Sequence, residues 1–394
     1  MKVLFISSRF PLPADTGGKI RILNLLRLLA ARHEIVMLSF ARSGPVCGAH
    51  LREMARICTV HDPVEIQPGS RRGSWWFSDP RWHSDSMRLQ IESEIRTGGY
   101  QFVIAAEVLA GFYAADIQAL PRLVDNCELT VLKDAWTNTK QRLPVRAWWE
   151  WRKKSGFTAS LVNRLDASTV VSEKERELLI SLGVPPAKIL VAANGVDLQH
   201  HRPEWGPPDE ATIVYPGCID FHANRDAMRY FVGEILPAIR ARHPGIRLRI
   251  TGEATQAQRR EANPANDRSV EFTGFVPDVR PIVACSAVCV VPLRVGGGTR
   301  VKILEAMALG TPVVSTSKGA EGLPLVAGRE ALVTDTPASF ADAVCRLLEE
   351  SDLRSSIREN ALRLVQRQFD WSLSLRPILA YMEGCSSASG TDTR

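Results

Sequence analysis

The stretch that best predicts the fold is Pro292-Leu-Arg-Val-Gly-Gly-Gly-Thr-Arg-Val-Lys-Ile-Leu-Glu-Ala-Met-Ala-Leu-Gly-Thr-Pro-Val-Val-Ser-Thr316, where a glycine-rich turn leads into a helix and then a buried strand. Gly296, Gly297 and Gly298 allow a sharp turn that brings backbone N–H groups close to a ligand. We expect Thr299 to cap the helix, whose unpaired N–H groups and dipole favour an anion at its start. The stretch therefore predicts a phosphate-binding turn in an α/β domain.

Two cations and a carboxylate follow in the first turns of this helix. Arg300 and Lys302 add positive charge and hydrogen-bond donors for a phosphate. Glu305 lies three residues beyond Lys302, on the same helical face. A carboxylate beside a phosphate is repelled unless it accepts hydrogen bonds from sugar hydroxyls, and a nucleotide sugar supplies both groups. The alternative is a purely structural turn, and the pattern is neither a P-loop nor Gly-x-Gly-x-x-Gly, so it indicates neither an ATPase nor a dehydrogenase.

Continued by Gly319-Ala-Glu-Gly-Leu323, the stretch resembles the donor-binding signature of family-4 retaining glycosyltransferases. That family usually carries two glutamates separated by seven residues, the first near the transferred sugar and the second on the nucleotide ribose. The resemblance implies that Glu305 binds the ribose. Gly297 stands where the first glutamate is expected, so backbone amides or another side chain would contact the sugar, whose identity is left open.

The composition is that of a globular protein long enough for two domains. Of 394 residues, 45% are hydrophobic and 23% charged, and no apolar run reaches the roughly 18 residues of a membrane-spanning helix. The apolar part of Met1–Phe10 is too short for a signal peptide, so we expect a cytoplasmic protein. The net charge of +6 suits anionic substrates or an anionic membrane surface rather than nucleic acid. Eight cysteines without a Cys-x-x-Cys pair indicate neither a zinc site nor a redox dithiol.

Short β-branched runs alternate with helical patterns, which indicates parallel sheets covered by helices on both faces. A first series of strands is expected at 3–7, 34–40, 102–105, 123–125, 167–171 and 189–192, with helices over 19–32 and after Ser172. A second series has strands at 212–215, 247–251, 270–273, 287–291 and 312–315, and helices over 225–242, 339–349 and 353–368. The Pro-rich stretch Arg202–Pro208 between the two series reads as an interdomain linker.

This order of elements resembles the GT-B-type architecture, an α/β fold of two facing doubly wound Rossmann-like domains with parallel sheets. The resemblance implies an acceptor domain over 1–200 and a nucleotide-sugar donor domain over 208–370. A helix over 371–385 would pack back on the first domain, and we expect a disordered tail over 386–394. Doubly wound sheets bind ligands beyond the carboxyl ends of their strands, so the cleft between the domains is the expected active site.

Two glycine positions extend the resemblance. Gly17 and Gly18, in the first strand-to-helix loop, resemble the family's N-terminal glycine pair, which implies close approach of the backbone to donor or acceptor; the alternative is a turn that needs positive φ. Gly217 opens a loop where many relatives carry an arginine and a lysine that neutralise the diphosphate. Cys218 takes the arginine's place, so our hypothesis is that Arg300 and Lys302 supply this charge.

Candidates for catalysis are weaker. Asp125 and Glu128 follow a strand of the first domain, where relatives place polar groups that face the acceptor; they would orient or deprotonate its hydroxyl, or simply cap the next helix. His222 is a lone histidine in the Gly217 loop that either touches substrate or is structural. Val276, in Gly274-Phe-Val-Pro-Asp278, belongs to a loop that resembles the one holding the nucleotide base through backbone groups.

The segment Arg146-Ala-Trp-Trp-Glu-Trp-Arg-Lys-Lys154 joins three tryptophans to three consecutive cations. This suits a helix that dips into an anionic membrane, as a lipid-linked acceptor would require. A core-packing helix with a solvated basic end is the alternative. The membrane contact, if made, would be peripheral on the inner face of the plasma membrane.

We expect sugar transfer from a nucleoside diphosphate donor to a hydroxyl of a glycan or lipid-linked acceptor, in surface or exopolysaccharide synthesis. Retention at the anomeric carbon is implied by the resemblance. No Asp-x-Asp occurs, so we expect no metal and no other cofactor. A nucleotide-sugar epimerase and a non-catalytic nucleotide-sugar binding protein are the alternatives.

Overall fold

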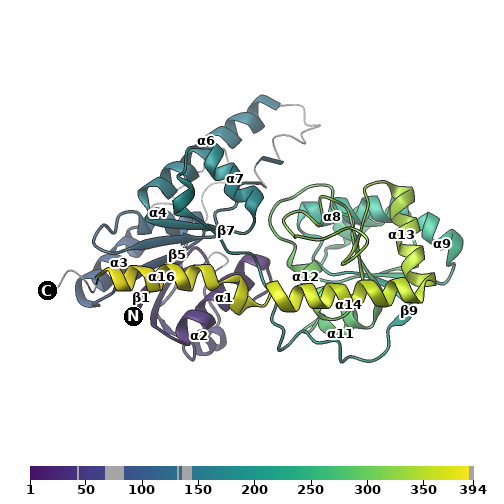
Figure 1. Ribbon diagram of the computed structural model, residues 1–394, viewed down its shortest axis with the longest axis horizontal. Helices are drawn as coiled ribbons and strands as arrows, with labels where there is room; N and C mark the ends of the chain where they lie inside the picture. The colour runs from purple at the N-terminus through teal and green to yellow at the C-terminus, as the bar shows by residue number, and fades with distance from the viewer. Residues whose placement is uncertain (42–43, 67–83, 131–132, 135–143, 390–394) are drawn as a thin grey trace. The chain divides into compact units, whose positions relative to one another are not determined.

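The computed structural model describes residues 1–41, 44–66, 84–130, 133–134 and 144–389 (Figure 1). Its contacts divide the chain into two compact units. Unit 1 comprises Met1–Ala193 with Ser374–Arg394, and unit 2 comprises Asn194–Leu373. A C-terminal helix returns the chain to unit 1. The boundary after Ala193 lies a few residues before position 200, where the first domain was expected to end.

Unit 1 is built on a parallel sheet with the strand order β3-β2-β1-β5-β6-β7-β8, and β4 pairs with β2 beyond the end of β3. Its central strands are buried on both faces, which explains their uninterrupted apolar runs. The strands are β1 (Lys2–Ser7), β2 (Glu34–Ala41), β3 (Thr59–Val60), β4 (Val64–Glu65), β5 (Phe102–Ala106), β6 (Arg122–Asp125), β7 (Ala167–Val170) and β8 (Ile189–Val191).

The helices of unit 1 cover this sheet through apolar stripes. In α1, the residues Ile22, Leu25, Leu26 and Leu29 are buried, as their spacing predicts. Ser172 caps α7 by accepting a hydrogen bond from the Glu175 N–H, which confirms the predicted cap. The helices are α1 (Gly17–Ala30), α2 (Gly48–Met54), α3 (Asp85–Thr97), α4 (Glu107–Ala114), α6 (Pro144–Arg164), α7 (Glu173–Ser181), the short 3-10 helix η2 (Pro186–Lys188) and α16 (Arg376–Ser389).

The yellow helix α16 lies along unit 1 in Figure 1. Ile378 and Met382 are fully buried, and the Tyr381 ring packs edge-on against Phe102 of β5. The predicted disorder is wrong for 386–389, since the last turn of α16 continues to Ser389. Residues 390–394 lie outside the described part of the chain.

Unit 2 repeats the design with a six-stranded parallel sheet in the order β11-β10-β9-β12-β13-β14. Its strands are β9 (Asp209–Tyr215), β10 (Arg247–Ile250), β11 (Val270–Phe272), β12 (Ser286–Val291), β13 (Val313–Ser315) and β14 (Leu332–Val333). Its helices are α8 (His222–Tyr230), α9 (Leu236–Arg242), α10 (Gln256–Ala262), α11 (Arg280–Ala284), α12 (Val301–Ala308), α13 (Pro337–Glu349), α14 (Ser351–Gln368) and α15 (Trp371–Ser374, which reaches the boundary of unit 1).

Two sequence predictions change in unit 2. The single helix expected over 225–242 consists of α8, a π-helical segment η3 (Phe231–Ile235) and α9, because Pro237 enters the first turn of α9 without an N–H to donate. The stretch Arg202–Pro208 packs on unit 2 instead of linking the units. Trp205 lies under the guanidinium of Arg280, and its carbonyl accepts from the Cys285 thiol.

Each sheet has a topological switch point. In unit 1, β1 is followed by β2 on one side, whereas β5 lies on its other side and is followed by β6 farther out. In unit 2, β9 and β12 stand in the same relation, followed by β10 and β13. Ligands of such sheets bind beyond the carboxyl ends of the strands at this point. The loops after β1 and β5, and those after β9 and β12, are therefore where each unit is built to bind.

Candidate functional site

The glycine-rich turn follows β12 at the switch point of unit 2. Gly296 (φ +110°) and Gly298 (φ +74°) both adopt backbone conformations that other residues rarely take, as expected for the turn. Thr299 is not the N-cap of α12 as predicted: it is buried before the helix begins, and Arg300 is the N-cap. The reason is that the left-handed residue Gly298 carries the turn one position further before helical geometry begins. The donor contact of Thr299 stays a prediction.

Lys302 projects from the first turn of α12 among neutral groups. Its ammonium donates to the Tyr215 hydroxyl at 2.8 Å and to Asn224 Oδ1 at 3.3 Å, and it lies 4.0 Å from the centre of the Tyr215 ring. Burial lowers the pKa of Lys302 to about 7. No carboxylate lies within ion-pair distance of Lys302 in the described ranges. A half-buried cation whose hydrogen-bond partners are both neutral favours the binding of an anion.

The loop after β9 is open to the same ammonium. Gly217 has φ +150°, and a Cβ built on it would come within 2.6 Å of Lys302 Nζ. Asn224 donates to the Cys218 carbonyl and accepts from Tyr215, so it links this loop to the strand and to Lys302. Gly217 is therefore needed to let the loop approach the cation.

Arg300 adds a second positive charge close to Lys302. Its Nη1 donates to the Gly298 carbonyl at 3.0 Å, so the guanidinium folds back over the turn. A Cβ on Gly296 would come within 3.3 Å of Arg300 Nη2. After burial, the charge of Arg300 is a further cause that lowers the pKa of Lys302, which shows that the two cations repel each other. Gly297 lies half-buried between the two left-handed glycines.

Glu305 lies one turn beyond Lys302 on α12, with 23% of its side chain exposed. Burial raises its pKa, while the nearby charges of His201 and Lys302 act in the opposite direction. His201 Nε2 lies 3.9 Å from Glu305 Oε1, and its Nδ1 lies 3.0 Å from the Asp197 carbonyl oxygen. Sequence analysis did not single out His201, because this contact joins residues more than a hundred positions apart.

The remaining candidates of unit 2 lie in loops at the same edge of the sheet. The Cys218 thiol donates to the Glu253 carbonyl, and burial raises its pKa, so it supplies no charge in place of the family's arginine. Arg225, the nearest cation beyond this loop, is paired with Glu261 at 2.9 Å. His222 is the exposed first residue of α8, packed edge-on against Phe221. Val276 is half-buried in the loop after β11.

Asp125 is not available for catalysis, which corrects its prediction as a candidate base. It is 1% exposed and accepts from Arg21 Nε at 2.8 Å and Arg21 Nη2 at 2.7 Å. The Thr169 hydroxyl also donates to it at 2.6 Å. Both oxygens are thus used inside unit 1, where the pair ties α1 to the ends of β6 and β7. Glu128 lies half-buried three residues farther on and stays a prediction.

The predicted glycine pair begins α1, at the switch point of unit 1. Gly17 is exposed, and a Cβ there would meet nothing within 4 Å. A Cβ on Gly18 would come within 3.0 Å of Glu107 Oε1 and 3.7 Å of the Arg9 guanidinium. Neither glycine has positive φ, so the alternative of a left-handed turn is wrong. Gly18 lies close to Glu107 and Arg9, and the approach of a donor or acceptor to either glycine stays a prediction.

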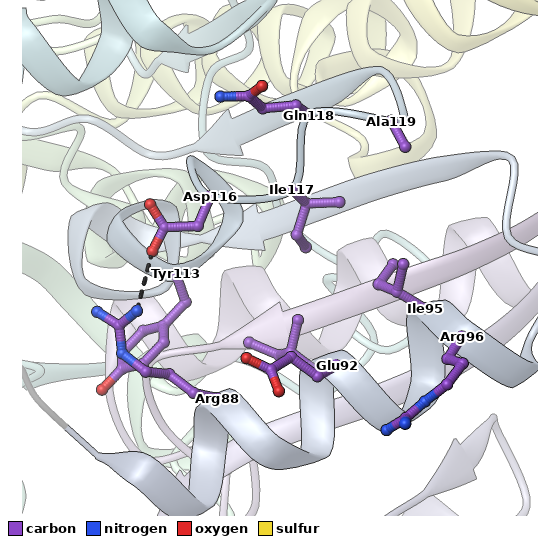
Figure 2. Close-up of a pocket in the computed structure, with 10 residues that line it drawn as sticks. Arg88, Glu92, Ile95, Arg96, Tyr113, Asp116, Ile117, Gln118 and Ala119 are labelled. Atoms are coloured by element: carbon purple, nitrogen blue, oxygen red, sulfur yellow. Dashed lines mark hydrogen bonds and ion pairs between the residues drawn. The ribbon is translucent and has the colours of Figure 1, made fainter.

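A cavity of about 480 Å³ in unit 1 lies away from these loops (Figure 2). Its walls come from α3 and from the segment after α4, and Arg88 forms an ion pair with Asp116 at its rim. Since Glu107 begins α4 at the carboxyl end of β5, the segment after α4 returns to the amino ends of the strands. The cavity is therefore on the wrong edge of the sheet for the predicted chemistry.

The tryptophans of α6 divide between two environments. Trp148 and Trp149 are 37% and 47% exposed, and Arg152 lies over the Trp148 ring. Trp151 packs against the core of unit 1. One face of α6 thus packs on the core, as the core-packing alternative predicts. The other face carries exposed aromatic and basic groups, as a membrane-surface helix requires. No helix in the described residues is long and apolar enough to cross a membrane.

Comparisons with known proteins agree with this geometry. The family model Glycosyltransferase Family 4 matches residues 16–200, and Glycosyl transferases group 1 matches residues 210–350. A glycogen synthase of Mycobacterium tuberculosis is 26% identical, over 94% of this chain and 92% of its own length. An uncharacterised 44.6 kDa protein in the cps region of Klebsiella pneumoniae is 22% identical, over 94% of this chain and 96% of its own. Among solved structures, Anabaena HepE in complex with UDP and glucose superimposes with a TM-score of 0.70 at 16% identity, covering 98% of this chain and 100% of that one.

Proposed function

The chain belongs to the family-4 glycosyltransferases of the GT-B type, and we propose that it moves a sugar from a nucleoside diphosphate sugar to a hydroxyl of a glycan or lipid-linked acceptor. The observation that carries this proposal is Lys302, a half-buried cation whose hydrogen-bond partners are neutral, at the switch point of unit 2. Together with Arg300 and the start of α12, it provides the positive charge that a diphosphate needs.

The donor would lie along α12. The diphosphate contacts Lys302, Arg300 and the turn amides, with Gly217 leaving room for it. Glu305, one turn farther on, accepts hydrogen bonds from the ribose hydroxyls. The loop that contains Val276 supports the base through its backbone. Because HepE binds UDP, uridine is the first nucleotide to test.

The reaction requires stabilisation of a leaving diphosphate. The acceptor oxygen forms a bond to the anomeric carbon, and the bond from that carbon to the diphosphate oxygen breaks with its electron pair. The acceptor's proton passes to the departing diphosphate or to water. Lys302, Arg300 and the helix dipole stabilise the developing charge, so we propose a metal-independent transfer. We propose retention at the anomeric carbon from the family resemblance alone. Full activity in excess EDTA is expected, and loss of activity on chelation would contradict metal independence.

We further propose that the acceptor belongs to surface or exopolysaccharide synthesis and is reached at a membrane. The cps-region relative supports the first part, and the exposed Trp148 and Trp149 with nearby basic groups support the second. Peripheral binding on the inner face of the plasma membrane would suit a lipid-linked acceptor. Flotation with vesicles that contain anionic lipid tests it: Trp148→Ala/Trp149→Ala should lower binding, and equal binding would reject the membrane role.

The test of function begins with the donor. Thermal shift of the purified chain against UDP-, GDP- and ADP-sugars selects the nucleotide, and transfer to a panel of saccharides follows. We expect released nucleoside diphosphate and a glycosylated acceptor. Epimerised donor formed without acceptor would indicate an epimerase, and binding without turnover would indicate a binding protein.

A further inference from the structure

The switch point of unit 1 holds a carboxylate that the sequence did not single out. Glu107 is the first residue of α4, directly after β5, and it faces Ser8 and Arg9, which follow β1. These are the two loops between which a doubly wound sheet binds its ligand. Glu107 therefore occupies, in unit 1, the kind of position that the phosphate-binding groups occupy in unit 2.

The carboxylate is held firmly through one of its oxygens. Glu107 Oε2 accepts from Arg9 Nε at 3.0 Å, from Arg9 Nη2 at 2.7 Å and from the Ser8 hydroxyl. The other oxygen, Oε1, lies 2.7 Å from Arg9 Nη2. A carboxylate offers about four lone-pair sites, so Oε1 keeps capacity for a further donor.

Glycine leaves space in front of that oxygen. A Cβ on Gly18 would lie 3.0 Å from Glu107 Oε1, which is closer than most Cβ contacts and would require the carboxylate to shift. Without that Cβ, a small group can reach Oε1 from the side of α1. The side chains of Glu107 and Arg9 are 16% and 26% exposed, so the pair is accessible yet largely shielded from water.

The backbone of Glu107 is strained for the sake of this position. Its φ of +69° lies in the left-handed region, which glutamate rarely adopts and glycine adopts freely. Such strain persists where the surroundings hold the residue in place, and it clusters at functional sites. A glycine here would relax the backbone, so the side chain must be what the position requires.

We propose that Glu107 is the acceptor-binding carboxylate, whose Oε1 accepts a hydrogen bond from a hydroxyl of a neutral saccharide while Arg9 fixes the carboxylate. The inference rests on the proposed function and deepens it. A carboxylate already neutralised by Arg9 attracts neither a cation nor an anion strongly, but it still accepts well from hydroxyl groups. Glu107 orients the acceptor hydroxyl but does not remove its proton. That proton passes to the departing diphosphate or to water.

The experiment uses the full chain, UDP-glucose and the other nucleotide sugars as donors, and glucose, galactose, maltose and N-acetylglucosamine as acceptor probes. In Glu107→Gly, relief of the backbone should offset the loss of the ion pair with Arg9, so the melting temperature should change little. Donor affinity and donor hydrolysis by water should stay within about threefold, while kcat/KM for the acceptor falls by about 100-fold. Glu107→Gln keeps an accepting oxygen but loses the charge, so its kcat/KM for the acceptor should fall by about tenfold.

Matched controls separate this role from a structural one. Asn266→Gly relaxes another left-handed residue, far from either switch point in the sequence, and should leave transfer unchanged. Gly18→Ala fills the space before Oε1 and should lower acceptor use, whereas Gly48→Ala, which meets only the end of Arg52 at 3.5 Å, should not.

Three outcomes would overturn the inference. If kcat/KM for the acceptor stays within threefold of wild type in both Glu107 variants, the inference about Glu107 fails and the proposed function still stands. Equal losses in donor affinity and in acceptor kcat/KM for the Glu107 variants would make the residue structural or donor-binding. A wild-type chain that binds a donor but transfers to no probe would overturn the inference together with the proposed function.

Discussion

The two switch points use charge in opposite ways. Beyond β9 and β12, Lys302 is surrounded by the neutral Tyr215 and Asn224 and lies close to Arg300, a like charge. Beyond β1 and β5, Arg9 is neutralised by Glu107 within the protein itself. The first site awaits an anion from outside, and the second presents a neutral pair of hydrogen-bonding groups. If the proposed sites are right, one architecture serves a charged donor and an uncharged acceptor, and the two sites differ in whether the ligand or the protein supplies the counter-charge.

The largest expected effect is a loss of stability at a second arginine–carboxylate pair of unit 1, Arg21 with Asp125. Asp125→Asn removes the charge opposite the buried Arg21 and should lower the free energy of unfolding by about 3–5 kcal/mol, because an unpaired buried charge remains. Denaturant unfolding measures it. The exposed pair Arg88–Asp116 is the control, and Asp116→Asn should cost less than about 1 kcal/mol. Similar losses in both variants would mean that burial does not distinguish the pairs.

Lys302 tests the counter-charge that the donor is meant to supply. Lys302→Ala and Arg300→Ala should each weaken binding of UDP-glucose, or of the donor that the thermal-shift panel selects, by about 10- to 100-fold, since a charge-assisted contact is lost. Calorimetric titration gives the affinity. Arg363→Ala removes an exposed cation of α14 paired with Glu359 and serves as the control. If both active-site variants stay within a few-fold of wild type, the diphosphate is bound elsewhere.

The pH dependence of donor binding follows from the same lysine. A pKa of about 7 means that Lys302 loses its proton above neutral pH in the free protein, whereas a bound diphosphate favours the charged form. Affinity for the nucleotide sugar should therefore be highest below pH 7 and fall by about tenfold between pH 7 and 8.5. The fall should vanish in Lys302→Ala. A wild-type affinity that is flat over this range would show that Lys302 stays charged without ligand.

The smallest effect concerns the ribose. Glu305→Gln keeps the shape of the side chain but weakens its hydrogen bonds to hydroxyls, so affinity for UDP should fall by about three- to tenfold. His201→Gln removes the imidazole near Glu305 Oε1 and should change affinity less. Comparing UDP with 2′-deoxy-UDP separates the roles: the preference for ribose should shrink in Glu305→Gln. If the preference for UDP over 2′-deoxy-UDP is unchanged in Glu305→Gln, Glu305 does not bind the ribose.

The sequence predicted what depends on local geometry. Buried strands, the apolar face of α1 and the Gly296–Gly298 turn follow from periodicity and from glycine's freedom, and the structure confirms them. The N-cap of α12 was predicted at Thr299 but lies at Arg300. The left-handed Gly298 continues the turn for one more residue, and its φ depends on the whole turn.

What the sequence could not predict depends on contacts between distant positions. Asp125 looked like a catalytic group until the fold placed Arg21, over a hundred residues earlier, against both of its oxygens. Glu107 was missed because a left-handed glutamate has no signature in the sequence. Gly18 was noticed, but its reason became clear only when Glu107 lay beside it.

The helix α16 has a consequence for the order of synthesis. Its buried residues Ile378, Leu379 and Met382 belong to unit 1, yet they leave the ribosome only after all of unit 2. During translation, the apolar surface of unit 1 beside β8 stays uncovered, while unit 2 can complete its own core. The second unit in the sequence is thus the first that can be finished, and unit 1 stays exposed to chaperones and proteases until α16 docks.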